Sequence, residues 1–323
     1  MSPAETVAET LKSRRNILLL NHEAPDGDCL GSTLALARAL WARGQRATVG
    51  SSDGVPEMYR FLPSNDRVVT ALPAGEAFDT VVFMECSVPE RAGRLGAHAA
   101  GVPLVVNIDH HVSNTGYGDL VLWDVDAAAV AEVVSPIVRA LHPRLDADTA
   151  TCLLTALMTD TGSFHYASVT PRSFQLAAEL MAAGANPAGV FSQVYENRSA
   201  ASVRLLGMAL SRLVLSDDGR VAWTSVTQAM LRETGAAMEE SEGIVGSLRA
   251  IRGIQVALLF KEEPEGIHVS LRGMGGVRAH VIAEALGGGG HAAAAGFTVK
   301  EPLDEVIRRT LAVVRLELGA AAS

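Results

Sequence analysis

The chain has 323 residues, which is enough for one large domain or two ordinary ones, and we expect two. Hydrophobic residues make up 48% and charged residues 20% of the chain, as in ordinary globular proteins, so disorder is expected only at the termini. The formal net charge of -9 argues against a protein that coats long nucleic acid through non-specific phosphate contacts, although short anionic substrates are compatible with it.

The first half of the chain alternates between strand-like and helical patterns. An apolar run at residues 16–21 predicts a buried strand, and helical spacing follows over residues 31–44. Further short strands are expected at residues 45–50, 80–86 and 103–108. Strands that alternate with helices predict an α/β fold, with a mostly parallel sheet and helices on both of its faces. In such sheets ligands bind at the carboxyl ends of the strands.

The second half contains more helix and then a smaller α/β pattern. Before residue 214 we expect a strand at residues 120–123 and helices at residues 127–141, 147–159, 170–184 and 199–213. After the turn at residues 217–219, strand-like and helical segments alternate again. The chain is therefore expected to form an N-terminal domain over residues 1–190, a linker helix over residues 191–214 and a smaller C-terminal α/β domain over residues 215–323.

The cysteines and the N-terminus bear on the cellular compartment. Cys29, Cys86 and Cys152 are too few and too scattered for a disulfide framework, and no CxxC pair suggests a zinc knuckle. Residues 1–15 are polar and lack an apolar signal core, and no apolar run approaches the length needed to span a bilayer. We therefore expect a cytoplasmic protein without a membrane partner.

Acidic and imidazole side chains gather where several predicted strands and helices end. They are His22, Asp26, Asp28, Glu85, Asp109, His110, His111 and Asp160. If these segments meet at one edge of the sheet, their negative charge is too concentrated to pack without cations. Mixed carboxylate and imidazole ligands suit Mn²⁺ or Mg²⁺, whereas structural zinc sites prefer cysteine. Two ions bridged by a carboxylate are the usual arrangement for phosphoester hydrolysis.

Four segments carry a resemblance to a known family. They are residues 21–32 (NHEAPDGDCLGS), 107–111 (NIDHH), 159–164 (TDTGSF) and 287–297 (GGGGHAAAAGF). Together they resemble the signature motifs of the DHH phosphoesterase superfamily with its DHH-associated C-terminal domain. The short chain and its domain order are most similar to the branch of NrnA-type oligoribonucleases and 3′-phosphoadenosine 5′-phosphate (pAp) phosphatases. The resemblance implies a catalytic domain over residues 1–190 and a substrate-binding domain over residues 215–323.

The resemblance also implies a role for each motif residue. One metal ion would be held by His22 and Asp26, the other by Asp28, His110 and Asp160, and Glu85 would bridge the two. Asp109 would orient a ligand, and His111 would contact the scissile phosphate. Glycine backbone can approach phosphate closely and arginine can pair with it, so the substrate would be held by Arg272, Gly288, Gly289, Gly290 and His291. The implied cofactors are two Mn²⁺ ions, with Mg²⁺ or Co²⁺ as alternatives.

Two positions depart from the family pattern. Glu85 stands where the family normally has aspartate. Because glutamate is longer by one methylene, its carboxylate can bridge two ions only if the backbone lies further from them or the side chain folds back. The alternative interpretation is that Glu85 merely bonds a neighbouring histidine. Ala292 and Ala293 follow His291 in place of polar or basic residues, which leaves fewer side-chain contacts to the substrate.

The expected activity is metal-dependent hydrolysis of short RNA or DNA oligonucleotides, linear dinucleotides or pAp, with hydroxide from metal-bound water as the nucleophile. Two other interpretations stay open: a pyrophosphatase of the same superfamily, and a non-catalytic nucleotide sensor in which Glu85 has disabled the bridge. A RecJ-type exonuclease is disfavoured, because the chain lacks room for an OB-type domain and has no broad basic surface. The sequence does not rank these substrates and does not give the cleavage polarity. It is also compatible with a homodimer.

Overall fold

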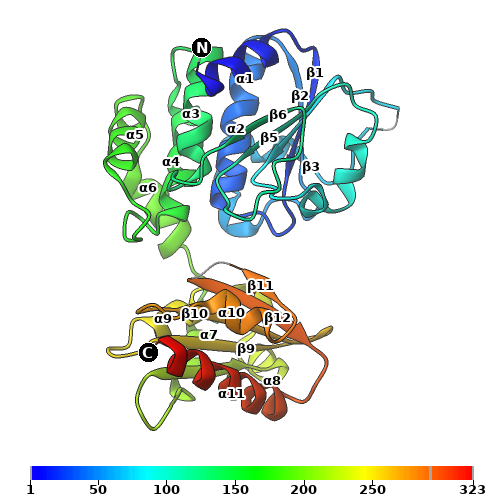
Figure 1. Cartoon of the computed structure of the whole chain (residues 1–323). Coiled ribbons are helices and arrows are strands. Elements are labelled where there is room, and N and C mark those ends of the chain that lie inside the picture. The colour runs from blue at the N-terminus through cyan, green and yellow to red at the C-terminus, as the bar shows by residue number, and fades with distance from the viewer. Residues whose placement is uncertain (1, 74, 291–292, 322–323) are drawn as a thin grey trace. The chain divides into compact units, whose positions relative to one another are not determined.

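The computed structural model describes residues 2–73, 75–290 and 293–321, and this part of the chain forms two compact units (Figure 1). The boundary between the units falls between Asn197 and Arg198. Each unit is built on a six-stranded sheet and has hydrophobic core clusters of its own. Within these residue ranges, no helix combines the length and the apolar character needed to cross a membrane.

The sheet of the first unit is entirely parallel. Its strands lie in the order β3 (Val68–Val69), β2 (Arg46–Gly50), β1 (Asn16–Asn21), β4 (Thr80–Met84), β5 (Val105–Asp109) and β6 (Leu120–Trp123). The order reverses between β1 and β4. In open parallel sheets ligands bind outside the carboxyl ends of the strands at such a reversal, so the ends of β1 and β4 mark the expected site.

Helices cover one face of this sheet, and 3₁₀ turns cover the other. The first face carries α1 (Pro3–Lys12), α2 (Gly27–Ala42), α3 (Val130–Leu141) and α4 (Ala147–Asp160), with α5 (Pro171–Ala182) and α6 (Pro187–Phe191) packed beyond them. Leu19 and Ile108 are buried in this layer, whereas Leu18 and Phe83 are buried on the opposite face under the 3₁₀ segment Pro89–Ala99. The predicted fold class is confirmed, although the second face is covered by 3₁₀ turns and not by α-helices.

The start of α2 explains how its first turn comes to carry a buried acid. The helix begins at Gly27, earlier than the residue 31 that its apolar spacing predicted, because the Asp26 carboxylate accepts a hydrogen bond from the Cys29 amide at 2.9 Å. Asp28 therefore lies in the first helical turn, where it is buried. A Cβ at Gly27 would lie 2.5 Å from a side-chain carbon of Thr159, so glycine lets the end of α4 lie beside this turn.

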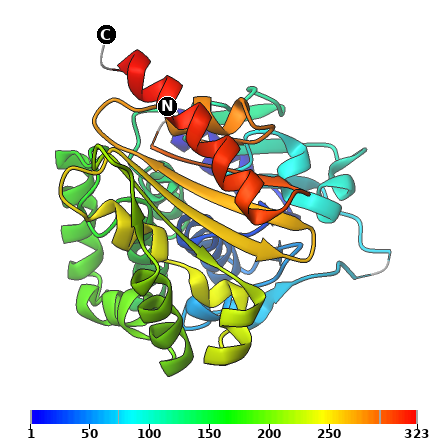
Figure 2. The same ribbon diagram turned by 90° about the horizontal axis from the view of Figure 1, so that it is seen from below.

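The second unit has a mixed sheet with helices on both faces (Figure 2). Its strands lie in the order β11 (Gly289–Gly290), β12 (Ala294–Val299), β10 (Gly266–Gly273), β9 (Val256–Glu263), β8 (Val221–Val226) and β7 (Val214–Leu215). β8 and β9 are parallel, and the other neighbours are antiparallel. One face packs against α10 (Ala279–Glu284) and α11 (Leu303–Ala321), and the other packs against α7 (Ala200–Ser211), α8 (Gln228–Thr234) and α9 (Ile244–Arg249).

The helix predicted to link the domains is part of the second unit. Leu205 and Ala209 of α7 are completely buried in a core cluster that includes Leu259 of β9. Thr224 of β8 donates a hydrogen bond from Oγ1 to the Ala209 carbonyl at 2.6 Å. These contacts fix α7, which lies within the predicted linker of residues 191–214, to the sheet of the second unit.

Candidate metal centre

The residues predicted as metal ligands come together at the carboxyl edge of the parallel sheet. His22, Glu85 and His110 follow β1, β4 and β5, while Asp28 lies at the start of α2 and Asp160 ends α4. The ligand atoms lie within 4.8 Å of one another in each of three groups. These groups are His22, Cys29 and Glu85; Glu85, His110 and His111; and Asp28, His110 and Asp160. Because Glu85 and His110 each belong to two groups, the residues form one continuous cluster.

His22 and Asp26 flank the turn from β1 into α2. The His22 ring donates a hydrogen bond from Nδ1 to the Glu23 carbonyl at 2.7 Å, which leaves Nε2 as its acceptor. Burial lowers the pKa of His22, so its imidazole is neutral at pH 7, the form that binds a metal ion. Asp26 Oδ2 lies 4.0 Å from His22 Nε2, and its other carboxylate oxygen caps α2. The pair therefore offers one nitrogen and one oxygen to a cation.

Asp28 is held rigidly by three hydrogen bonds. Its Oδ1 accepts from Ser32 Oγ at 3.0 Å and from the Ala131 amide at 3.1 Å, and its Oδ2 accepts from the Val130 amide at 2.5 Å. The two amides belong to the first turn of α3, whose N-cap residue Ala129 has no side chain that could cap it. Asp28 thus caps α3 across the fold. Burial, reinforced by the charge of Asp160, raises its pKa well above the ordinary value.

His110 lies between two carboxylates. It donates a hydrogen bond from Nδ1 to the Ala127 carbonyl at 3.0 Å, and its Nε2 lies 3.4 Å from Glu85 Oε1 and 3.5 Å from Asp160 Oδ2. Burial alone would lower the pKa of His110, but Glu85, Asp28 and Asp160 raise it to about 11. In the metal-free protein the imidazolium therefore neutralises part of the negative charge for which cations would otherwise be needed.

Glu85 lies at the centre of the cluster in a strained backbone conformation. Its φ is 57°, in the left-handed region that residues other than glycine rarely adopt. Among the residues that the structure describes, nothing forms a hydrogen bond with its buried Oε2. Burial, reinforced by the charges of Asp26 and Asp28, raises the pKa of Glu85 well above its ordinary value. A buried carboxylate oxygen without a partner is costly, and it fits the donor set that a divalent cation requires.

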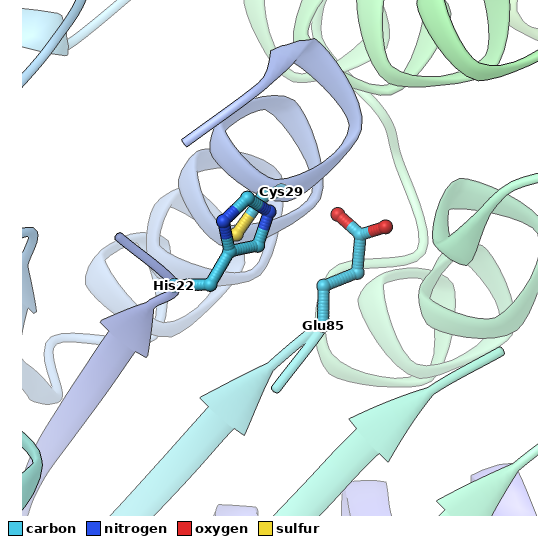
Figure 3. Close-up of side chains that lie close together, drawn as sticks. All are labelled: His22, Cys29 and Glu85. Carbon is cyan, nitrogen blue, oxygen red and sulfur yellow. The ribbon is translucent and has the colours of Figure 1, made fainter. Parts of the chain in front are cut away.

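Cys29 lies beside this carboxylate but has a partner of its own. Figure 3 shows its sulfur next to the His22 ring, with the Glu85 carboxylate facing both. Its Sγ donates a weak hydrogen bond to the Met84 carbonyl at 3.4 Å, and burial raises the pKa of the thiol well above its usual range. The thiol is therefore protonated at pH 7 and packs beside the proposed ligands.

Asp109 holds the His111 ring and the backbone amides of both histidines that follow it. Its Oδ1 accepts hydrogen bonds from the His110 amide at 2.7 Å, the His111 amide at 3.0 Å and His111 Nδ1 at 2.7 Å. Burial raises the pKa of Asp109, but the hydrogen bonds from His111 and Asn114 outweigh it and lower the pKa below its usual range. Asn114, which our sequence analysis missed, donates to Asp109 Oδ2 at 2.6 Å and to Asn107 Oδ1 at 2.7 Å. The only signal for it was an amide side chain shortly after His111.

The residues predicted to hold the substrate lie in the second unit. Arg272 is on β10, half-buried, with Nη1 donating to the Leu271 carbonyl at 2.9 Å. Gly288 needs to be glycine because a Cβ there would lie 2.2 Å from the Gly296 carbonyl, and a Cβ at Gly290 would lie 2.6 Å from a Cα of β12. Close strand packing thus requires glycine at Gly288 and Gly290, whereas a Cβ at Gly289 would have no atom within 4 Å. Gly289 pairs with β12, and His291 lies outside the described residues.

Asp160 makes the stability of the metal-free protein depend on pH. Burial, opposed in part by the charge of His110, raises its pKa from 3.8 to about 6 in the folded state. Because the folded state binds this proton more tightly than the unfolded state does, protonated Asp160 adds to the free energy of unfolding. This contribution is fully present below the unfolded pKa and is lost as the pH rises through about 6. His110 stays protonated across this range, because its pKa rises from 6.5 to about 11 on folding.

We expect the free energy of unfolding of Asp160→Asn to fall less than that of the wild type as the pH rises from about 4 to about 6. Urea unfolding in EDTA at a series of pH values measures both. Equal slopes for the two proteins would show that Asp160 titrates normally in the folded state.

Comparisons with known proteins match both units of the chain. The N-terminal domain model of the DHH family matches residues 16–157, and the DHHA1 domain model matches residues 220–319. A Thermus thermophilus protein named bifunctional oligoribonuclease and PAP phosphatase NrnA is 37% identical over 323 residues, which cover 98% of this chain and 94% of the relative. The Bacillus subtilis protein of the same name is 26% identical, over 90% of this chain and 91% of that protein.

A solved structure adds evidence on the fold. The exopolyphosphatase-related protein from Bacteroides fragilis superimposes with a TM-score of 0.94 over 100% of this chain and 98% of its own, at 21% identity. At that identity the likeness concerns the fold alone. The sequence matches go further, and they agree with the resemblance carried by the motifs around His22, His110 and Asp160. The chain belongs to the DHH family of phosphoesterases, with a DHHA1 domain as its C-terminal part.

Proposed function

We propose that this chain is a divalent-metal-dependent enzyme that hydrolyses short RNA oligonucleotides, linear dinucleotides and pAp. The observation that carries the proposal is the cluster of Asp28, Glu85 and Asp160 around His110, in which two buried carboxylates and one partly buried carboxylate all have raised pKa values. The choice of substrates is supported by the relatives from Thermus thermophilus and Bacillus subtilis, which are named oligoribonucleases and PAP phosphatases.

The proposed metal ligands fall into two sets that share one residue. We assign His22 and Asp26 to one ion, Asp28, His110 and Asp160 to the other, and Glu85 to both. We propose two Mn²⁺ ions, with Mg²⁺ or Co²⁺ as alternatives, because mixed carboxylate and imidazole ligands suit these ions. When bound, they would supply a water molecule of lowered pKa and would offset the charge of the phosphate.

The chain's own residues would hold the ligands and the substrate in place. Asp109 fixes the His111 ring through Nδ1, and Asn114 fixes Asp109 in turn. We propose that the His111 ring contacts the scissile phosphate, where a hydrogen bond stabilises charge that develops during the reaction. Asp109 would then act through His111 and not on the substrate itself.

The second unit is proposed to bind the substrate through Arg272, the glycine run Gly288, Gly289 and Gly290, and His291, the next residue in the sequence. If Arg272 pairs with a phosphate before the reaction, Arg272→Ala should raise KM for pAp by roughly 10- to 100-fold, the effect of losing about 1.5–3 kcal/mol of charged hydrogen bonding, and should change kcat less. Arg220→Ala is the matched control, since this partly exposed residue follows the turn at residues 217–219 and pairs with Asp218. An unchanged KM in Arg272→Ala would remove the residue from the substrate site.

The activity is tested by comparing an RNA dinucleotide, pAp and inorganic pyrophosphate as substrates, each with Mn²⁺ or with EDTA. We expect Mn²⁺-dependent release of mononucleotide from RNA and of phosphate from pAp, and little turnover of pyrophosphate. A preference for pyrophosphate would favour the pyrophosphatase interpretation. Tight binding of all three without turnover would favour a nucleotide sensor, in which Glu85 bonds His110 and bridges no ions.

We also propose a cytoplasmic location for this activity. Cys29, Cys86 and Cys152 are all free and buried, which fits a reducing compartment. The proposed partners are short oligonucleotides or a nucleotide bisphosphate, and no membrane partner is proposed.

A further inference from the structure

The loop between β6 and α3 (residues 124–129, the β6–α3 loop) positions two of the proposed metal ligands. The Ala127 carbonyl accepts the hydrogen bond from His110 Nδ1, and the first amides of α3, which follow the loop directly, donate to Asp28. Residues 127–129 are all alanine, so no side chain of this segment can hold it in place. Other residues must therefore fix the loop if His110 and Asp28 are to keep their positions.

Glu132 turns back onto this loop from the first turn of α3. Its side chain is completely buried. Its Oε2 accepts a hydrogen bond from the Ala128 amide at 3.3 Å, and its Oε1 accepts one from Ser173 Oγ of α5 at 2.6 Å. The contact with Ala128 resembles a capping box, in which a glutamate of the first turn satisfies an amide just before the helix.

Arg172 ties both ends of the β6–α3 loop together. Its Nη1 donates to Asp124 Oδ2 at 2.6 Å, and its Nη2 donates to the Glu132 carbonyl at 2.9 Å. Its Nε lies 3.4 Å from Glu132 Oε2, so the buried carboxylate also has a charged partner. At the start of the loop, the Asp124 amide donates to the Asp109 carbonyl at 3.1 Å. The loop is thus held from α3, from α5 and from the end of β5.

We propose that Glu132 is a positioning residue for the metal centre, an inference that rests on the proposed function. A buried carboxylate on an otherwise apolar helix face is costly, and its partners here are the loop and the residues that hold it. Among the described residues, no hydrogen bond or ion pair joins the Glu132 side chain to a proposed ligand. It holds the loop whose carbonyl orients His110 and, through the start of α3, the amides that orient Asp28. These are two of the four ligands proposed for one ion.

The test is calorimetric titration of the metal-free protein with Mn²⁺, which reads out binding without turnover. In Glu132→Ala we expect one of two Mn²⁺ sites to weaken by about 10- to 100-fold, as when residues that orient ligands are removed elsewhere, while the other site is unchanged. kcat for pAp should fall in parallel, with KM changing less. The matched control is Glu179→Ala, which removes an exposed ion pair between α5 and Arg139 of α3.

Two further variants separate positioning from general destabilisation. Glu132→Gln can still accept from the Ala128 amide and donate to Ser173 Oγ, so it should restore most of the Mn²⁺ affinity. Arg172→Ala, at a side chain that is 45% exposed, should weaken the same Mn²⁺ site without opening a cavity, even if Glu132→Ala does not fold. Unchanged Mn²⁺ affinity in Arg172→Ala and in folded Glu132→Ala would overturn the inference. A wild type that binds no Mn²⁺ would overturn the proposed function and the inference with it.

Discussion

Replacing His110 by alanine is expected to lower kcat on pAp and on RNA dinucleotides by about 10³-fold, because a metal-held phosphoryl group gains several kcal/mol of stabilisation and each 1.36 kcal/mol is worth tenfold. His110 is the residue whose loss should matter most, since its Nε2 lies within 3.5 Å of both Glu85 and Asp160. Without the imidazolium, those carboxylates lose their nearest cation in the metal-free protein, so its melting temperature should fall as well. Steady-state kinetics and thermal unfolding in EDTA measure the two effects.

The control for this variant is His98→Ala, at an exposed histidine of the 3₁₀ segment that our sequence analysis did not place in the site. It should leave kcat and the melting temperature unchanged. Asp28→Asn should lose activity as His110→Ala does, while its side chain keeps most of the shape of the carboxylate that caps α3. Full activity in folded His110→Ala would refute the metal assignment.

Glu85→Gln is expected to abolish Mn²⁺-dependent stabilisation together with activity. The wild type should gain about 2.7 kcal/mol from a site filled at 100 times its Kd, which corresponds to a rise of roughly 5–10 °C in the melting temperature of a domain of this size. Gln keeps the shape of Glu85 but lacks the charge needed to bridge two cations. A thermal shift titration with Mn²⁺ on both proteins measures the difference.

Glu85→Asp separates bridging from a merely structural role. Asp tolerates the left-handed φ of 57° better than Glu does, and the resemblance described above leads us to expect Asp at this position. If Glu85 bridges two ions, the Asp variant should keep or exceed wild-type activity. Retention of the full Mn²⁺ shift by Glu85→Gln would instead show that Glu85 does no more than bond His110. Loss of metal binding in Glu85→Asp would show that the site is adapted to the longer side chain.

The longer strands could be predicted because they are short apolar runs that end at polar residues, whereas the two-residue strands β3, β7 and β11 were missed. β1 and β6 coincide with the predicted ranges, and the ligand motifs follow the ends of β1 and β5 as the parallel topology requires. Helix starts were harder to place. The periodicity of α2 began at its apolar residues, whereas its true start is set by the Asp26 cap. α1 was read as a polar terminus, although Val7 and Leu11 are buried and Ser2 forms a capping box with Glu5.

The residues of the candidate metal centre could be picked out from the sequence, but most of the contacts that hold them could not. His22, Glu85 and Asp160 have side-chain types that are typical of metal sites, and the topology brings them together. Asn114 and Glu132 act through contacts that depend on loop paths, which local sequence does not encode. For Glu132 one signal existed: it is the only charged residue of residues 127–138, a segment that is otherwise apolar except for Ser135, and a carboxylate there needs buried partners. Sequence alone could not name those partners on α5.

The central claim, that these side chains hold two divalent cations, is tested most directly by anomalous diffraction from crystals of the wild type soaked in Mn²⁺. We predict two anomalous peaks roughly 3.5–4 Å apart with Glu85 between them. His22 and Asp26 should contact one peak, and Asp28, His110 and Asp160 should contact the other. A single peak away from Glu85, or no peak at a Mn²⁺ concentration that supports turnover, would contradict the account.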